Sequence, residues 1–211
     1  MSGPSRRVFT FGIAGIAGLT VGGCGGGGHG HSKSRGASGT TPSPYTGDLR
    51  TAALAAAVEN QAVSAYQGVD AALRAGKYGP AVPGLAAFVQ TAMAHHTEHA
   101  ASWNNVLRGA GKPVVVGSPL SGHALTAAIG AATSADAVVA ALQNLEVQAS
   151  QTYIAAVGRL SGSSAIAVSA ATIAPVEAMH AAALAYAFTG RSAVGEALGT
   201  VGAVPVTALT V

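Results

Sequence analysis

Two stretches of this chain repeat one pattern, and this repeat strongly limits what the chain can fold into. Residues 58–66 and 145–153 share Glu, Gln, Ala and Tyr at the same spacing, with the tyrosine seven positions after the glutamate. Each stretch lies in an Ala-rich segment whose apolar residues recur every three or four positions, which predicts a helix. We therefore expect two related helices, each with a glutamate close to its apolar stripe.

A second pair of segments carries histidine at helical spacing. His96 and His99 are three positions apart, as are Glu177 and His180, and residues three apart lie on the same face of a helix. The periodicity and the Gly, Pro and capping signals predict four long helices. Their approximate bounds are 48–76, 80–109, 133–161 and 163–188. We expect two helical hairpins related by a pseudo-twofold axis, because this arrangement brings the four motifs together.

The scarcity of charged residues makes these glutamates informative. Only 9% of the residues are charged and 49% are hydrophobic, whereas roughly 25% are charged in a typical soluble domain. An unpaired carboxylate is costly to bury, and no lysine or arginine is placed to pair with Glu59, Glu146 or Glu177. Metal binding would account for these carboxylates. A bundle whose buried carboxylates are only hydrogen-bonded is the alternative.

The order Glu, His-x-x-His, Glu, Glu-x-x-His on four helices resembles the ferritin-like superfamily, which includes di-metal carboxylate proteins. The resemblance covers about residues 48–190 and implies an all-α, antiparallel four-helix bundle with a long crossover between its second and third helices. It also implies one or two bound metal ions, with iron the first choice and Mn, Zn or Cu the alternatives. The ligands that it implies are Glu59 and Glu146 as terminal carboxylates, Glu177 as a bridging carboxylate, and His99 and His180 as terminal imidazoles.

The chain departs from the family pattern at His96, where the family has a second bridging glutamate. An imidazole donates one nitrogen to one metal, so we expect His96 to be a sixth, non-bridging ligand. Three glutamates do not neutralise two divalent ions, which favours one ion or an asymmetric pair. The histidine-rich set of ligands also suits Zn or Cu better than a carboxylate cage does.

The resemblance implies an activity as well as a site. Oxidation of Fe(II) or reduction of peroxide, catalysed by a bound iron, is the activity that we expect. A non-enzymatic role, in metal sequestration or as a stress-related structural protein with a degenerate site, is the alternative.

The net charge of +3 does not indicate a nucleic-acid partner. Arg6, Arg7, Lys33 and Arg35 all precede the predicted bundle, and residues 48–190 hold six Lys/Arg against seven Asp/Glu. A basic stripe with interleaved aromatic residues is missing from the sequence. The sequence predicts no particular oligomeric state.

Residues 1–24 are typical of an export signal. Arg6-Arg7 resembles the twin-arginine signal, and the apolar run over residues 8–23 is shorter than the about 20 residues of a membrane helix. Residues 21–24, Val-Gly-Gly-Cys, resemble a bacterial lipobox with Cys24 as the lipidated residue. The resemblance implies a lipid anchor at the outer face of the cytoplasmic membrane or in the cell envelope. A cytoplasmic protein with an unused thiol is the alternative.

The segments that flank the bundle are harder to interpret. Residues 25–47 are rich in Gly, Ser and Pro, which predicts a disordered tether. Residues 191–211 form an apolar tail interrupted by glycines and Pro205, for which the pattern predicts no structure.

Four residues near the motifs complete the expectations. Tyr66 and Tyr153 lie two turns, roughly 10 Å, from the glutamates of their own helices. We expect them to close the core layer, and a hydrogen bond to a ligand or a redox role is the alternative. His95 and Glu98 form a second pair, rotated by about 100° from the His96–His99 pair, and both pairs cannot face the centre equally. A second metal ion would need a hydroxide bridge or help from Glu98.

Overall fold

The computed structural model describes residues 42–121, 124–162, 164–191 and 194–211. Four long helices dominate these residues: α1 (Asp48–Arg74), α2 (Leu85–Gly109), α4 (Ala135–Val157) and α5 (Ser164–Thr189). Three short helices complete them: α3 (Ala124–Ala131), α6 (Val194–Ala197) and the 3-10 helix η1 (Val206–Ala208). In this part of the chain the only β structure is one isolated bridge, between Leu120 and Leu209. The predicted all-α fold is confirmed.

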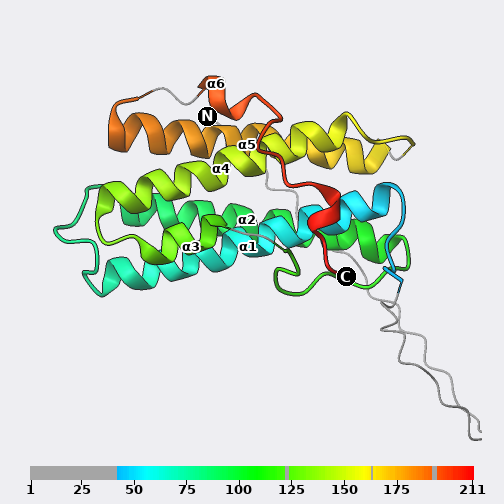
Figure 1. Cartoon of the computed structure of the whole chain (residues 1–211), viewed down its shortest axis with the longest axis horizontal. Helices are drawn as coiled ribbons and strands as arrows, with labels where there is room; N and C mark the ends of the chain where they lie inside the picture. Colours follow the sequence, from blue (N-terminus) through cyan, green and yellow to red (C-terminus); the bar gives the residue numbers. More distant parts are fainter. Residues whose placement is uncertain (1–41, 122–123, 163, 192–193) are drawn as a thin grey trace, which may run out of the picture. The chain divides into compact units, whose positions relative to one another are not determined.

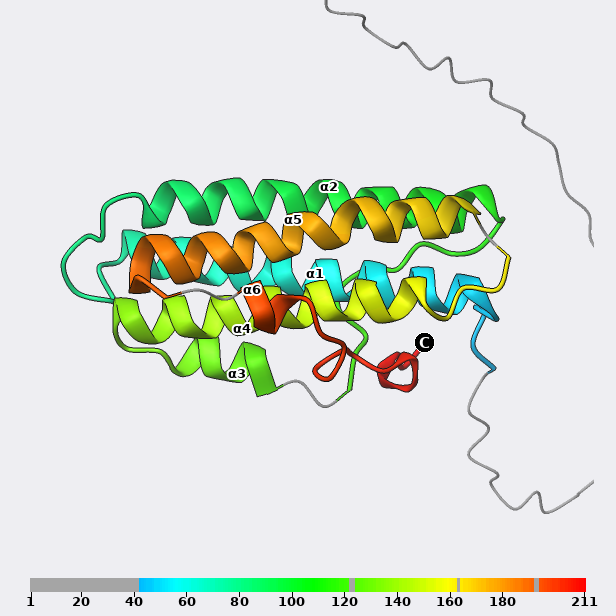
Figure 2. The same cartoon turned by 90° about the horizontal axis from the view of Figure 1, so that it is seen from above.

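The long helices form two hairpins. Helix α1 packs mainly on α2 and α4 packs mainly on α5, while α1 also contacts α4 and α2 contacts α5. Neighbouring helices run in opposite directions, as Figures 1 and 2 show. Figure 2 also shows that α2 ends and α4 begins at opposite ends of the bundle, so the link that contains α3 crosses its length. This link is the predicted long crossover.

Helix starts explain the main differences from the predicted bounds. Helix α2 begins at Leu85 rather than near Pro80, and its N-cap is Gly84 with a φ of 80°. Pro83 disfavours helical backbone at Val82, and the left-handed backbone of Gly84 is not helical, so the helix begins only at Leu85. Helix α4 is capped by Ser134, whose hydroxyl accepts a hydrogen bond from the Ala137 amide at 3.2 Å. The helix therefore begins slightly later than residue 133, where the sequence predicted its start.

Two apolar layers fill the bundle, and the four motifs lie between them. One layer is built around Leu54, Trp103 and Tyr153, and the other around Leu85 and Leu142. On every long helix the predicted ligand comes between residues of the first layer and residues of the second. The fold thus isolates one polar layer in the middle of the core.

Residues just before α1 and at the start of the crossover also pack against the bundle. Tyr45, which the sequence assigned to the tether, is 3% exposed and donates a hydrogen bond to the Pro113 carbonyl oxygen at 3.1 Å. In the crossover, Val115 is buried, and the Asn104 side chain bonds both its amide and its carbonyl group. The last residues before α1 and the start of the crossover therefore belong to the packed unit.

The C-terminal tail is held by three consecutive side chains of α4. The Ser150 hydroxyl donates to the Ala197 carbonyl oxygen at 3.0 Å, and the Gln151 amide donates to the Glu196 carbonyl oxygen at 2.6 Å. Thr152 accepts a hydrogen bond from the Val204 amide at 2.9 Å. The tail, for which the sequence predicted no structure, is thus held against α4 by hydrogen bonds.

Helix α5 is the only described helix that is long and apolar enough to cross a membrane by length and composition. It is also a core helix, because it carries the fully buried Glu177 and packs along α4. A buried helix of a soluble protein has the same composition. Pro175 lies inside this helix, which continues on both sides of it.

Candidate metal centre

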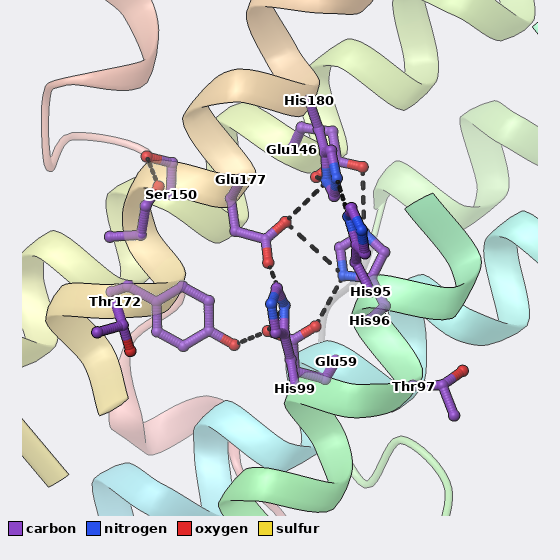
Figure 3. Close-up of polar contacts among 12 residues, drawn as sticks. Glu59, His95, His96, Thr97, His99, Glu146, Ser150, Thr172, Glu177 and His180 are labelled. Carbon is purple, nitrogen blue, oxygen red and sulfur yellow. Dashed lines mark hydrogen bonds and ion pairs between the residues drawn. The ribbon is translucent and has the colours of Figure 1, made fainter. Parts of the chain in front are cut away.

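Three glutamates from three helices meet in the polar layer. Glu59 of α1, Glu146 of α4 and Glu177 of α5 are each 0% exposed, and Figure 3 shows their carboxylates converging. Burial alone raises the pKa of a carboxyl group, but hydrogen bonds and charge from neighbouring histidines hold the pKa of Glu59 and of Glu146 below the usual range. Burial and the charge of Glu59 raise the pKa of Glu177 instead. Glu177 is therefore the carboxyl group that holds a proton most readily.

His96 lies at the centre of this group. Its Nδ1 is 2.7 Å from Oε2 of Glu59, and its Nε2 is 3.1 Å from Oε1 of Glu146. Both contacts are hydrogen bonds donated to a carboxylate only if the ring is protonated on both nitrogens. Burial lowers the pKa of His96, but the charges of Glu146 and Glu177 outweigh it and raise this pKa well above the usual value. Without metal, a charged His96 therefore links the two hairpins.

His99 and His180 approach Glu177 from two sides. Nδ1 of His99 is 2.8 Å from Oε1 of Glu177, and Nδ1 of His180 is 3.4 Å from Oε2 of Glu177 and 3.5 Å from Oε2 of Glu146. Burial lowers the pKa of both histidines, but the adjacent carboxylates overcome this and raise each to about 9. The metal-free cluster thus takes up protons at neutral pH.

Tyr66 and Tyr153 contact the carboxylates across the bundle. The Tyr66 hydroxyl donates to Oε1 of Glu146, and the Tyr153 hydroxyl donates to Oε1 of Glu59. Each tyrosine therefore donates a hydrogen bond to the glutamate of the other hairpin, not to the one on its own helix. Burial and the adjacent carboxylate raise the pKa of both hydroxyls well above the usual value, so they stay protonated. Both rings lie in the apolar layers, as expected, and the alternative of a hydrogen bond to a predicted ligand is confirmed as well.

Sequence reasoning missed His95. Its Nδ1 is 3.0 Å from Nε2 of His180, and the ring is only partly buried. Burial and the neighbouring His180 lower the pKa of His95. The 100° rotation from His96 turns His95 away from the carboxylates but toward α5, and the spacing of this pair on α2 could not reveal a contact with another helix. Glu98, the other rotated residue, is exposed and lies outside the cluster.

The structure therefore brings all six predicted ligand side chains into one layer. They form two overlapping groups whose ligand atoms lie within 4.8 Å of one another. The first group is Glu59, His96, His99 and Glu177, and the second is His96, Glu146, Glu177 and His180. His96 and Glu177 belong to both. Cys24, His29, His31 and His123 lie outside the described residues.

Hydrogen bonding within the cluster is incomplete. In the part of the chain that the structure describes, six buried side-chain atoms have no hydrogen-bond partner, and five of them belong to this cluster. They are Nδ1 of His99, Oε2 of Glu146, both carboxylate oxygens of Glu177 and Nδ1 of His180. These five atoms face one another as ion pairs at 2.8–3.5 Å. Buried polar atoms are almost always hydrogen-bonded as well, so the missing hydrogen bonds require an explanation. Carboxylate oxygens and imidazole nitrogens are the donors that iron, manganese and zinc take in proteins, so the residues present fit a metal ion.

The fold and the cluster together define a four-helix bundle with a polar Glu/His layer in its core. The ferritin-like domain family matches residues 76–190 of the 211 residues, and the protein belongs to this family. The match includes α2, α4 and α5 with five of the six predicted ligands, and it leaves out α1 with Glu59. Comparisons with curated proteins and with solved structures find no significant match.

Proposed function

We propose that the protein binds divalent metal between the four long helices, with iron as the first metal to test. The observation that carries this proposal is the pair of overlapping Glu/His groups in one buried layer, where five ligand atoms face one another at 2.8–3.5 Å without forming hydrogen bonds. A metal ion would satisfy these atoms and neutralise the carboxylates.

The two overlapping groups assign a role to each ligand. Glu177 is the carboxylate shared by both groups, which supports it as the bridging ligand. Glu59 and His99 complete one group, and Glu146 and His180 complete the other. A neutral His96 can donate a nitrogen to only one of them. One ion bound more tightly than a second therefore fits this ligand set better than a symmetric pair.

Iron held in this layer would supply one-electron redox chemistry, and we propose oxidation of Fe(II) or reduction of peroxide as the reaction. The chain itself contributes positioning and exclusion of water. Tyr66 and Tyr153 each hold one carboxylate oxygen of Glu146 and Glu59, respectively. The apolar layers above and below keep bulk water out.

A metal-free structural role is the second candidate, and His96 is the observation that favours it. A doubly protonated His96 bonds Glu59 and Glu146 together. Three imidazoles also face three carboxylates in this layer. The cluster can therefore balance its charge with protons alone, which is what a degenerate site or a metal-sequestering protein with weak affinity would do.

Metal content distinguishes these candidates. Protein purified from its native envelope, and protein loaded in turn with Fe(II), Mn(II), Zn(II) and Cu(II), is analysed by inductively coupled plasma mass spectrometry. We expect one tightly bound ion per chain, or one tight and one weak ion, with the most in the iron sample. Stoichiometries below a tenth of an ion under every loading condition would leave only the structural role.

We also propose that the protein is exported and anchored in the cell envelope by a lipid on Cys24. The sequence of residues 1–24 supports this proposal. Cys24→Ala should release the protein from the membrane fraction or stop its processing, as read by fractionation and by the mass of the mature chain. Unchanged fractionation together with an unchanged mass contradicts the anchor.

A further inference from the structure

The contact between His95 and His180 joins a partly exposed ring on α2 to a ring of the metal centre on α5. Nδ1 of His95 and Nε2 of His180 are 3.0 Å apart, a normal hydrogen-bond distance. Figure 3 shows His95 beside His180, on the side of that ring away from Glu177. His95 has no role in the ligand groups themselves, which contain neither of its nitrogens.

The ring geometry shows that this contact is an in-plane hydrogen bond. The two ring planes are only 10° apart, and the ring centres are separated by 5.2 Å. A centre-to-centre distance so much longer than the 3.0 Å N···N contact places the two nitrogens between the centres. The rings therefore meet edge to edge. The lone pair of an imidazole nitrogen and an N–H bond both lie in the ring plane, so donor and acceptor face each other directly.

The opposite nitrogen of His180 faces the carboxylates. Nδ1 of His180 lies 3.4 Å from Glu177 and 3.5 Å from Glu146, and it has no hydrogen-bond partner among the described residues. A neutral imidazole carries one proton, and a proton on Nε2 leaves the Nδ1 lone pair free for a metal. The position of one proton thus decides whether His180 can be a ligand.

We infer that His95 is a positioning residue for His180: its Nδ1 accepts a hydrogen bond from Nε2–H of His180 and so holds the Nδ1 lone pair of His180 toward the centre. Outer partners of this kind fix the tautomer and orientation of a histidine ligand and contribute about tenfold to hundredfold to metal affinity. The usual outer partner is a carboxylate, a backbone carbonyl or water, whereas here it is a second histidine.

The other hairpin supplies no such partner. Val176 precedes Glu177 on α5 as His95 precedes His96 on α2, and a valine side chain accepts no hydrogen bond. At this position α5 therefore offers His99 no equivalent acceptor. It follows that the half of the centre that contains His180 is the better organised, and that it takes the first ion.

This inference rests on the proposed metal function, and two variants of His95 separate the hydrogen bond from the shape of the ring. His95→Asn places an amide oxygen close to the position of Nδ1 but removes the ring. His95→Phe keeps a flat ring but removes the acceptor, and His95→Leu is a second variant without an acceptor in case the phenylalanine variant does not fold. Glu98→Gln, an exposed change on the same helix, is the matched control.

Affinity is measured with Co(II) by competition with a chelator, and the ligand geometry is read from the visible spectrum of the bound Co(II). We expect His95→Phe to lose about tenfold to hundredfold in affinity and to change the spectrum. His95→Asn should stay within about threefold of the unmodified protein, and Glu98→Gln should bind Co(II) like the unmodified protein. Unchanged affinity and spectrum in His95→Phe, or an equal loss in His95→Phe and His95→Asn, overturns the inference.

A second measurement needs no metal and keeps the two proposals apart. Nitrogen-15 NMR of the metal-free protein should show a slowly exchanging Nε2–H proton on His180, which exchanges rapidly in His95→Phe. Its absence from the unmodified protein overturns the inference even if metal binds. If the unmodified protein binds no metal but shows this proton, the proposed function fails and the hydrogen bond stands.

Discussion

The hairpins α1–α2 and α4–α5 carry the same buried ligand on their first helices but different ones on their second helices. Glu59 and Glu146 are buried at related positions, and each accepts a hydrogen bond from the tyrosine of the other hairpin. On the second helices, α2 places His96 where α5 places Glu177. One hairpin therefore provides a cation to the metal-free cluster at the position where the other provides an anion.

This difference explains how three buried carboxylates persist without lysine or arginine. In a symmetric site, a second Glu-x-x-His motif would add a fourth carboxyl group, which would need a metal ion or a proton to balance its charge. His96 instead donates to Glu59 and Glu146 from the centre of the layer. The metal-free cluster thus holds its three carboxylates with a positively charged group, His96, at its centre.

The largest effect should come from removing the group shared by both halves. Glu177→Ala eliminates the only carboxylate common to the two ligand groups, so we expect it to abolish tight metal binding. Metal content by mass spectrometry after loading measures this effect. Glu98→Ala is the control on an exposed part of α2 and should retain the metal. Full metal content in Glu177→Ala would show that the two halves do not share this ligand.

The comparison can be reversed by making the two second helices alike. His96→Glu gives α2 the Glu-x-x-His motif of α5, so the loaded variant should bind two ions with similar affinity. Its metal-free form should lose about 3–5 kcal/mol in the free energy of unfolding, because a buried cation is replaced by a fourth buried carboxyl group. Denaturant unfolding with and without metal tests both expectations. A variant that is equally stable without metal contradicts the role of His96 as the internal cation.

Variants of Tyr66 and Tyr153 test whether the two first helices, α1 and α4, are equivalent in their hydrogen bonds to the glutamates. Tyr66→Phe and Tyr153→Phe each remove one hydrogen bond to a buried carboxylate, which should cost about 1.5–3 kcal/mol in the free energy of unfolding. We expect similar losses from both, since both contacts join the two hairpins. Denaturant unfolding of the metal-free variants measures them. A loss in only one variant would show that the hairpins are not equivalent even in their first helices.

A dependence of stability on pH should involve His99 and His180 together. Their pKa values of about 9 lie above the ordinary value of 6.5, so the folded metal-free protein binds protons that the unfolded chain releases. This stabilisation is complete below about pH 6.5 and is lost as the pH rises through about 9. Thermal melting of the metal-free protein between pH 6 and 10 measures it.

Metal affinity should change with pH in the opposite direction. An ion must displace the protons on these histidines, so affinity should rise about tenfold per pH unit for each proton released, up to about pH 9. Chelator competition at several pH values reads the slope. A metal-free protein that is most stable at pH 10, or an affinity that does not change with pH, contradicts the protonated cluster.

The sequence alone determined the architecture and the composition of the polar layer. The helical period located the four long helices, and the three-residue spacing of His96–His99 and Glu177–His180 placed each pair on one face. Because charges are so few, the buried glutamates were conspicuous. These features are local to one helix, so periodicity and composition are sufficient to find them.

Only the tertiary structure decided which groups meet across helices. The spacing along α1 and α4 measures the distance from each tyrosine to its own glutamate, and so could not show that Tyr66 bonds Glu146 and Tyr153 bonds Glu59. The same holds for His95, which is rotated away from its neighbours on α2 but meets His180 on α5. Such contacts depend on the rotation and height of one helix against another, and packing of the complete core sets both.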